Sequence, residues 1–183
     1  MIALLSNVTI DSLALQVEKS LGEKVFLLPG FDAWRAGLLD PASPLWRNGD
    51  ARNEDAQSGD AVGTIFLILH GPALFPDGVD ARFADVLSEP LKILSQARLA
   101  ARRDKVFVVS TLDLPSSPIL PLAGRDFAVQ ACAWWRAELE KLELPVLDLR
   151  EIAAEAGRER FYSAKMWYFG ALPFSRQGEA LLA

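Results

Sequence analysis

Residues 64–72 read Thr64-Ile-Phe-Leu-Ile-Leu69-His70-Gly71-Pro72, an apolar run that stops at a histidine, a glycine and a proline. Every position after the threonine is apolar up to the histidine. A strand of this kind is buried on both faces, which is typical of a central strand in a parallel sheet with helices on both sides. We therefore expect a strand over residues 64–69 at the centre of an α/β sheet.

On both sides of this run, short apolar segments alternate with helical patterns, which is typical of βαβ units. Further strands are expected at residues 2–5, 25–28, 106–110 and 145–149. Helices are expected at residues 9–21, 31–39, 127–142, 150–156 and 175–182. This alternation predicts a three-layer α/β/α sandwich with a five-stranded, mainly parallel sheet of flavodoxin-like strand order. The length of 183 residues predicts a single domain over residues 1–183.

Two segments are expected to be surface loops. Residues 46–60 are polar and charged and hold few β-branched side chains, and residues 115–121 hold three prolines. Pro90 predicts that a helical region is interrupted at Glu89, because proline lacks the backbone N–H. Near the C-terminus, Gly157 is expected to end a helix and Ser175 to begin the last one.

The bulk composition argues against several classes of partner. A formal net charge of −5 disfavours binding to a nucleic-acid backbone. The apolar runs are far shorter than the roughly 20 residues that cross a membrane, and the N-terminus lacks the features of a secretory signal. We therefore expect a cytoplasmic protein that binds neither membrane nor nucleic acid. The single Cys132 and the single His70 give no metal-ligand spacing, so neither a metal nor another cofactor is expected, and Cys132 is interpreted as a core residue.

Small polar residues follow several of the expected strands at their carboxyl ends. In doubly wound sheets, ligands bind in the crevice at this edge, beside the first strand. Helix N-termini there also favour anions such as phosphate or carboxylate. We therefore expect a ligand site formed by the first turn, the ends of the third and fourth strands and an aromatic loop over residues 161–174, with the lining residues Ser6, Asn7, Thr9, His70, Gly71, Thr111, Trp167 and Tyr168. The same loop is also interpreted as a hydrophobic lid in which Trp167 and Phe169 pack the last helix onto the sheet.

Several motifs follow one another along the chain: Ser6-Asn7-Val8-Thr9, Trp34 with Leu38-Leu39-Asp40-Pro41-Ala42-Ser43-Pro44-Leu45, Val146-Leu147-Asp148-Leu149, Gly157, Trp167-Tyr168 and Pro173-Phe174-Ser175. In this order and spacing they resemble the N-terminal domain of FkbH-like proteins. In these bacterial proteins an SGNH-hydrolase-like domain precedes a haloacid-dehalogenase-type phosphatase domain. The resemblance covers nearly the whole chain except residues 46–60.

The resemblance implies a role beside the chemistry of the phosphatase-type domain. In polyketide pathways that domain loads a phosphorylated three-carbon glyceryl unit onto an acyl carrier protein. Its Asp-rich catalytic motif does not occur in this sequence. The partners implied are thus a phosphatase-type domain, in cis or in trans, and an acyl carrier protein. This chain would be the N-terminal part of a longer protein or a stand-alone relative.

The resemblance also locates the positions of a catalytic triad. SGNH hydrolases carry a nucleophilic serine after the first strand and an Asp-x-x-His pair before the last helix, so that the histidine takes the serine proton. In this sequence those three positions hold Val8, Ser163 and Pro173. None of the three side chains can take the role required at its position, so the resemblance implies a non-hydrolytic accessory or binding domain.

Two other functions remain open from the sequence. A divergent esterase or acyltransferase could use Ser6 or Thr9 as the nucleophile and His70 as the base, if the imidazole lies within hydrogen-bond reach of the hydroxyl. Against this, Thr9 is interpreted as the N-cap of the first helix, and Ser6 or Asn7 as a partner for amides of the turn. The other alternative is a purely structural docking or dimerisation module.

Overall fold

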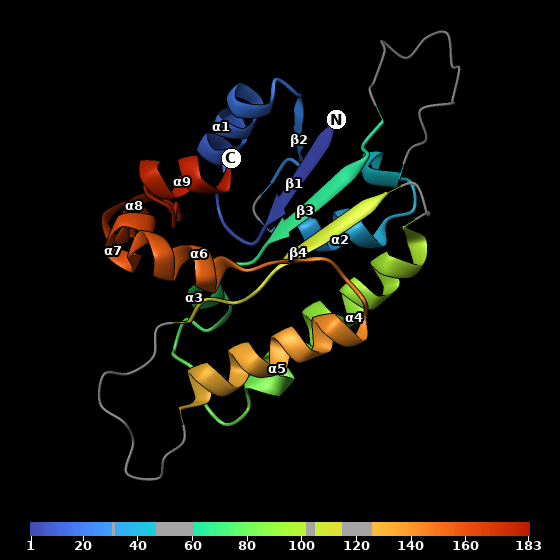
Figure 1. Ribbon diagram of the computed structural model, residues 1–183. Helices are drawn as coiled ribbons and strands as arrows, with labels where there is room; N and C mark the ends of the chain where they lie inside the picture. The colour runs from blue at the N-terminus through green and yellow to red at the C-terminus, as the bar shows by residue number, and fades with distance from the viewer. Residues whose placement is uncertain (31, 47–60, 102–104, 115–125) are drawn as a thin grey trace, which may run out of the picture.

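The computed structural model describes residues 1–30, 32–46, 61–101, 105–114 and 126–183 (Figure 1). Five parallel strands form one sheet in the order β2-β1-β3-β4-β5. The strands are β1 (Ile2–Ser6), β2 (Val25–Leu27), β3 (Thr64–Ile68), β4 (Val106–Ser110) and β5 (Val146–Leu147). The predicted α/β class, the parallel sheet and the flavodoxin-like order are therefore confirmed. Of the loop expected at residues 46–60, Trp46 belongs to the short helix η1 (Pro44–Trp46), and the remainder lies outside the described residues, as does the loop expected at 115–121.

The central position of β3 follows from its apolar sequence. It pairs with β1 from Ile2 opposite Thr64 to Ser6 opposite Ile68, and with β4 on its other edge. Successive side chains of a strand point to opposite faces. Both faces of the sheet can therefore be buried only if helices cover both, which is the arrangement observed.

Helices lie in two layers, one on each side of the sheet (Figure 1). One layer holds α2 (Trp34–Leu39), α4 (Phe83–Ala100) and α5 (Phe127–Lys141), and the other holds α1 (Asp11–Leu21), α6 (Leu149–Ala156), α7 (Arg158–Phe161) and α9 (Arg176–Leu182). The fold also contains the short helical segments η1 (Pro44–Trp46), α3 (Gly71–Leu74) and α8 (Ala164–Gly170). The three-layer prediction is confirmed.

Each face of the sheet has its own hydrophobic core. The α2–α4–α5 core includes Ala3 and Leu5 of β1, whereas the α1–α6–α9 core includes Ile2 and Leu4 of the same strand. The first core also buries Cys132, as expected, and burial raises the pKa of its thiol. β1 thus joins the two cores, because alternate side chains belong to different layers.

Helix α4 runs without a break through Pro90, so the expected interruption at Glu89 is wrong. A proline inside a helix removes one hydrogen bond and costs about 3 kcal/mol. The helix buries Leu87, Leu94 and Ala97 in the core on this side of the sheet, and Pro90 itself is buried. Burial of an apolar face over five turns outweighs this local cost.

The first helix begins later than expected. Its N-cap is Ile10, which makes no side-chain cap bond, so the interpretation of Thr9 as the cap is wrong. The backbone N–H of Thr9 donates instead to the carbonyl of Ala171 at 3.2 Å. The backbone of Thr9 is therefore held by the C-terminal segment, a contact that no local pattern could reveal.

The last helix begins as the sequence predicts. The side chain of Ser175 accepts a hydrogen bond from the N–H of Gly178 and caps α9, and Gly157 ends α6 with a φ of 83°. In contrast, the aromatic segment is not one loop, because α8 forms within it. Phe169 is 74% exposed, so it does not pack α9 onto the sheet, whereas Trp167 packs against the α1–α6–α9 core.

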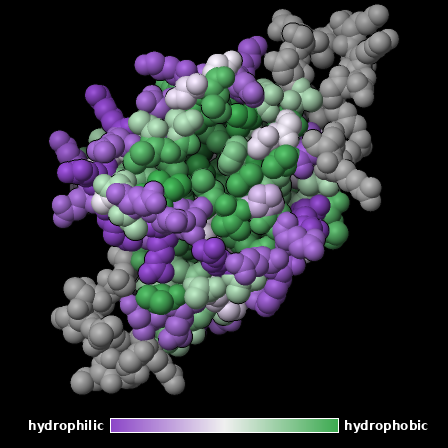
Figure 2. Space-filling model, in the orientation of Figure 1, coloured by the Kyte–Doolittle hydropathy of each residue, from purple (hydrophilic) through white to green (hydrophobic). Residues whose placement is uncertain are grey.

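None of the described helices is both long enough and apolar enough to cross a membrane. Figure 2 shows apolar side chains gathered in the middle of one face of the molecule, with charged and polar side chains around them.

Candidate functional site

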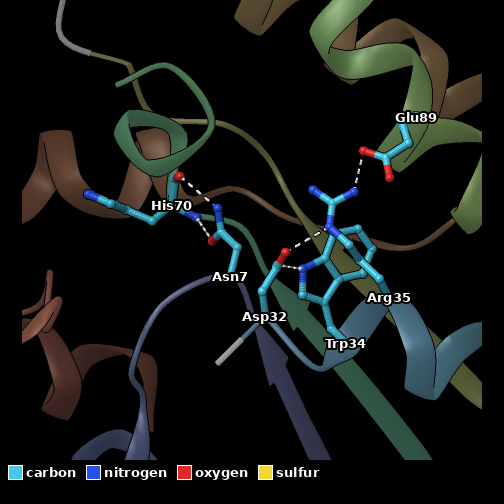
Figure 3. Close-up of polar contacts among 6 residues, drawn as sticks. All are labelled: Asn7, Asp32, Trp34, Arg35, His70 and Glu89. Atoms are coloured by element: carbon cyan, nitrogen blue, oxygen red, sulfur yellow. Dashed lines mark hydrogen bonds and ion pairs between the residues drawn. The ribbon is translucent and has the colours of Figure 1, made fainter. Parts of the chain in front are cut away.

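The turn after β1 is tied to the end of β3 by the side chain of Asn7. Its amide nitrogen donates to the carbonyl of His70 at 3.2 Å, and its amide oxygen accepts from the N–H of His70 at 2.8 Å (Figure 3). Both residues are buried. Since this pair satisfies one N–H and one C=O that have left the sheet ladder, it fixes the two strand ends against each other.

The imidazole of His70 points away from Asn7 (Figure 3). It lies edge-on to Trp167, with 4.6 Å between ring centroids, and its centroid is 5.8 Å from that of Tyr162. Burial lowers the pKa of His70 from 6.5 to about 4, because water no longer solvates the charged form. At neutral pH the ring is therefore uncharged and carries one N–H donor and one acceptor nitrogen.

His70 lines a cleft of about 420 Å³ that we call the β4 cleft. Its walls come from the ends of β3 and β4, from α7 and from α8 with the residues around it. The lining residues are His70, Pro72, Asp113, Arg158, Glu159, Tyr162, Ser163, Ala164, Trp167 and Pro173. This volume falls in the range of about 300–1,000 Å³ that is typical of small-molecule sites.

An ion pair forms the polar wall of the β4 cleft. Nη1 of Arg158 donates to Oδ1 of Asp113 at 2.6 Å. Burial, followed by the charge of Asp113 and a hydrogen bond with its side chain, raises the pKa of Tyr162 well above its usual range, so its phenol stays protonated. The cleft thus combines the paired carboxylate of Asp113, the carboxylate of Glu159 and neutral hydrogen-bonding groups.

Ser6 and Thr9 line a different cleft, of about 340 Å³, that we call the β1 cleft. It lies at the ends of β1 and β2, against the start of α1 and α2. The hydroxyl of Ser6 donates to the carbonyl of Ile68 at 2.7 Å and accepts from the N–H of Val8 at 3.2 Å. No hydrogen bond joins Ser6 or Thr9 to His70 in the described part of the chain.

An ion-pair network stands beside the β1 cleft (Figure 3). Asp32, in the left-handed region with φ of 55°, accepts hydrogen bonds from the indole of Trp34 and from Nε of Arg35, the latter at 2.8 Å. Arg35 also pairs with Glu89 of α4. Because Trp34 lines the cleft and is buried, the network fixes one wall of that cleft onto the α4 layer.

Three other residues expected at the ligand site have different surroundings. Thr111 is buried and its hydroxyl donates to Asp148, which caps α6, at 3.1 Å. Gly71 packs closely on the segment after β4, so that a Cβ there would lie 2.8 Å from the Leu114 side chain. Tyr168 is 84% exposed on α8. His70 and Trp167 are the expected residues that the structure brings together in the β4 cleft.

The positions identified with a catalytic triad are also separated. Ser163 and Pro173 line the β4 cleft, whereas Val8 lines the β1 cleft. The hydroxyl of Ser163 accepts from the N–H of Met166 at 3.3 Å and caps α8. In the described residues, no group of three or more His, Cys, Asp or Glu side chains is placed to hold a metal ion.

Among the polar residues that line the β4 cleft, sequence reasoning missed Asp113, Arg158, Glu159 and Tyr162. The signal for Asp113 was present, since it is an acidic residue inside the apolar run Thr111-Leu112-Asp113-Leu114, three positions after a buried strand. A carboxylate in such a run is buried and has to be paired. Its partner is 45 residues away, so only the fold identifies it.

Two solved structures share this fold. The N-terminal part of the protein BF1531 from Bacteroides fragilis, containing a phosphatase domain complexed with Mg, matches with a TM-score of 0.74 and 10% identity, over 99% of this chain and 48% of that one. A lipase/acylhydrolase from Enterococcus faecalis matches with a TM-score of 0.50 and 14% identity, over 99% of this chain and 90% of that one.

These likenesses establish the fold alone. This chain spans about half the length of the Bacteroides structure. No protein-family model matches the chain, and no curated protein sequence matches it significantly. The expected similarity to a phosphatase-containing protein and to an acylhydrolase therefore holds for the architecture, while membership of the FkbH-like family stays a prediction.

Proposed function

We propose that this chain is a non-hydrolytic, SGNH-like accessory domain of an FkbH-like protein. In this role it binds part of a carrier-linked substrate in the β4 cleft and assists a phosphatase-type domain that loads a three-carbon unit onto an acyl carrier protein. The accessory role draws support from the Bacteroides neighbour, whose chain contains a phosphatase domain and is about twice as long as this one.

The observation that carries the non-hydrolytic part is the separation of the two candidate nucleophiles, Ser6 and Thr9, from the imidazole of His70. Ser6 and Thr9 line the β1 cleft, whereas His70 lines the β4 cleft. Nucleophilic catalysis requires the base within about 2.6–3.2 Å of the hydroxyl. A base with a pKa of about 4 is also poorly matched to proton abstraction at neutral pH.

Ester hydrolysis tests this part of the proposal. Turnover of 4-nitrophenyl acetate and butyrate is measured for the wild type and for Ser6→Ala, Thr9→Ala and His70→Ala, each first confirmed to be folded. We expect the same background rate in all four proteins, since loss of a triad member costs on the order of a millionfold. Robust hydrolysis that disappears in His70→Ala and in one hydroxyl variant would instead establish the divergent esterase.

A loading assay tests the accessory role. A phosphatase-type domain of an FkbH-like protein is given an acyl carrier protein and a glyceryl donor, with and without this domain. We expect faster loading with the domain present, and loss of that gain in Trp167→Ala. The matched control is Leu99→Ala, which changes an exposed residue on α4 far from the cleft and should keep the gain. Equal loading rates with and without the domain contradict the accessory role.

A further inference from the structure

His70 is a nearly buried residue of the β4 cleft whose imidazole has no protein partner among the described residues. The residue is 8% exposed, and burial is the one cause of its lowered pKa, with no hydrogen bond to the ring. Neither ring nitrogen is fully enclosed, because the unpaired side-chain atoms without accessible surface belong to other residues. The ring lies against Trp167 and Tyr162, which line the same cleft. The imidazole is therefore open to a ligand in the cleft.

The other polar groups inside the cleft are either paired or act as donors. The carboxylate of Asp113 is held by Arg158 and by the hydroxyl of Tyr162. Arg158 uses Nη1 in this pair, and its remaining N–H groups make no hydrogen bond to the described residues. The hydroxyl of Ser163 accepts a bond from the backbone of α8, while its own hydrogen has no acceptor in the described part of the chain. A ligand that fits these groups therefore supplies an acceptor.

His70 can act as a donor to such an acceptor. Because burial lowers its pKa to about 4, the ring is uncharged at pH 7 and carries one N–H. The nitrogen that holds this proton is normally decided by the hydrogen bond that the other nitrogen makes. Since no described residue bonds to the ring, the proton can occupy the nitrogen that faces the ligand. The imidazole thus serves this ligand as a donor and not as a base.

The charges at the cleft favour an acceptor without charge. Asp113 neutralises Arg158, and Glu159 adds an exposed carboxylate at the rim. The two carboxylates and one guanidinium leave the lining with a net negative charge. An anion would lose its water in this cleft without meeting an unpaired cation, which is unfavourable. An uncharged acceptor such as a carbonyl oxygen avoids this cost.

The rest of the wall is apolar and partly aromatic. It consists of Pro72, Ala164, Trp167, Pro173 and the ring of Tyr162. Apolar and flat groups pack favourably on surfaces of this kind. Small-molecule sites typically have such a lining, with a few polar groups that orient the ligand. The ligand that fits this wall has an apolar body and one polar end.

We propose that the β4 cleft binds uncharged carbonyl compounds, with the N–H of His70 donating to the carbonyl oxygen and the apolar body packed against Trp167. A carbonyl oxygen has two lone pairs, so it can also accept from Ser163 or Arg158. This inference rests on the binding role proposed above for the same cleft. It differs from the anionic ligand that small polar residues at strand ends suggest, and it gives His70 a role other than that of a base.

Three aromatic compounds of similar size test the proposal on the wild-type protein at pH 7. Acetophenone has an uncharged carbonyl and no bond that an esterase could hydrolyse. Benzoate carries its acceptor oxygens as an anion, and protonated 1-phenylethylamine carries donors alone. Each is titrated while two-dimensional NMR follows the indole N–H of Trp167, assigned with Trp167→Phe. The indole of Trp34 is the internal control, because Trp34 lines the β1 cleft.

His70 supplies a second readout because it is the single histidine of the chain. Long-range proton–nitrogen NMR spectra therefore report its two ring nitrogens without ambiguity. If His70 donates to the carbonyl, the ring stays uncharged and its proton is fixed on one nitrogen. The two nitrogen shifts should then move apart as acetophenone saturates the protein. A ketone that only packs against the ring would leave both nitrogen shifts in place.

We expect a saturable shift of Trp167 with acetophenone, and at least tenfold weaker binding of both benzoate and 1-phenylethylamine. His70→Phe keeps a flat ring but has no N–H, so it should weaken acetophenone by roughly fivefold or more. His70→Gln restores an N–H donor and should recover part of this loss. Glu159→Gln is the control at the rim and should leave acetophenone binding unchanged.

Several results would overturn the proposal. These are binding of benzoate or 1-phenylethylamine as tight as that of acetophenone, undiminished acetophenone binding by His70→Phe, and nitrogen shifts of His70 that stay in place at saturation. No saturable shift at all, or a shift confined to Trp34, also overturns it. His70→Phe is interpreted only if its near-ultraviolet circular dichroism matches that of the wild type, and the compound series with the nitrogen shifts decides the proposal without it.

The outcome is distinguishable from that of the tests of the proposed function. If ester turnover appears while the preference for acetophenone and the nitrogen shifts persist, the non-hydrolytic function fails and the carbonyl assignment stands. If loading is stimulated but the three compounds bind alike, the accessory role stands and the carbonyl assignment fails.

Discussion

Asn7 links two strand ends through the backbone N–H and C=O of His70. Asn7→Ala would leave the N–H of His70 buried and unpaired, whereas the C=O would still accept from the N–H of Ala73 at 3.1 Å. We expect this change to lower the free energy of unfolding by roughly 1–3 kcal/mol, the cost of one unsatisfied buried group. Urea unfolding measures it. Ser20→Ala, on the exposed side of α1, is the control and should stay within about 0.5 kcal/mol. Similar values for both variants contradict the bridging role.

His70 makes stability depend on pH in a defined window. Because burial lowers its pKa from 6.5 to about 4, the unfolded chain binds a proton below pH 6.5 while the folded protein does not. The free energy of unfolding should therefore fall by up to roughly 3 kcal/mol as the pH drops from 6.5 to 4, and this group adds no slope above pH 6.5.

The difference between the wild type and His70→Gln isolates this effect, because all carboxyl groups are common to both proteins. We expect the wild type to lose stability relative to the variant across this window. Urea unfolding at half-unit steps of pH measures the difference. A difference that stays constant from pH 4 to pH 7 would show that the imidazole titrates normally in the folded protein.

The sequence predicts those parts of a site that depend on residues close together in the chain. Asn7 and His70 follow apolar strands directly, so their place at the carboxyl edge could be predicted from the chain alone. The hydrogen bonds between Asn7 and His70 could not be predicted from the sequence. The placement of Ser6 and His70 in two different clefts could not be predicted either, because it depends on the conformation of the turn after β1. Asp113 and Arg158 are distant in sequence, and nothing local marks them as partners.

The packing of helix α9 depends on a close approach between Gly178 and the backbone of Phe161. A Cβ at Gly178 would lie 2.2 Å from the carbonyl oxygen of Phe161, which is backbone and cannot turn aside. We expect Gly178→Ala to destabilise the protein by about 1–3 kcal/mol or more, as overpacking does. The control is Gly170→Ala in α8, where the nearest atom is 3.5 Å away on the Leu172 side chain. Thermal unfolding compares the two. Equal melting temperatures for the two variants would mean that α9 can shift relative to α7 and relieve the close contact.

Two helices show why local patterns fail at the level of elements. Pro90 predicts a break, yet α4 continues because its apolar face is buried over its whole length. The aromatic residues before α9 suggest a packed lid, yet α8 buries none of its residues fully and exposes Tyr168 and Phe169. Strands were easier to predict than these helices, because a doubly buried strand is apolar at nearly every position.

For the molecule as a whole, β1 couples the two cores. Leu94→Ala removes a buried side chain from the α2–α4–α5 core, and Leu13→Ala removes one from the α1–α6–α9 core. We expect each to cost about 2–5 kcal/mol. Both should keep a single transition, seen alike by far-ultraviolet circular dichroism and tryptophan fluorescence. The exposed controls Leu99→Ala and Leu15→Ala should change little. A biphasic curve for either core variant contradicts this coupling.

The order in which the two cores are completed has a consequence during translation. The buried residues of the α2–α4–α5 core lie between Ala3 and Leu144, whereas the other core also needs Leu149, Phe161 and Phe174. A chain leaving the ribosome can therefore close one side of its sheet while the other is covered by α1 alone. Apolar surface exposed in this way promotes aggregation and attracts chaperones. We expect ribosome-associated chaperones to hold the nascent chain until Phe174 has emerged from the exit tunnel.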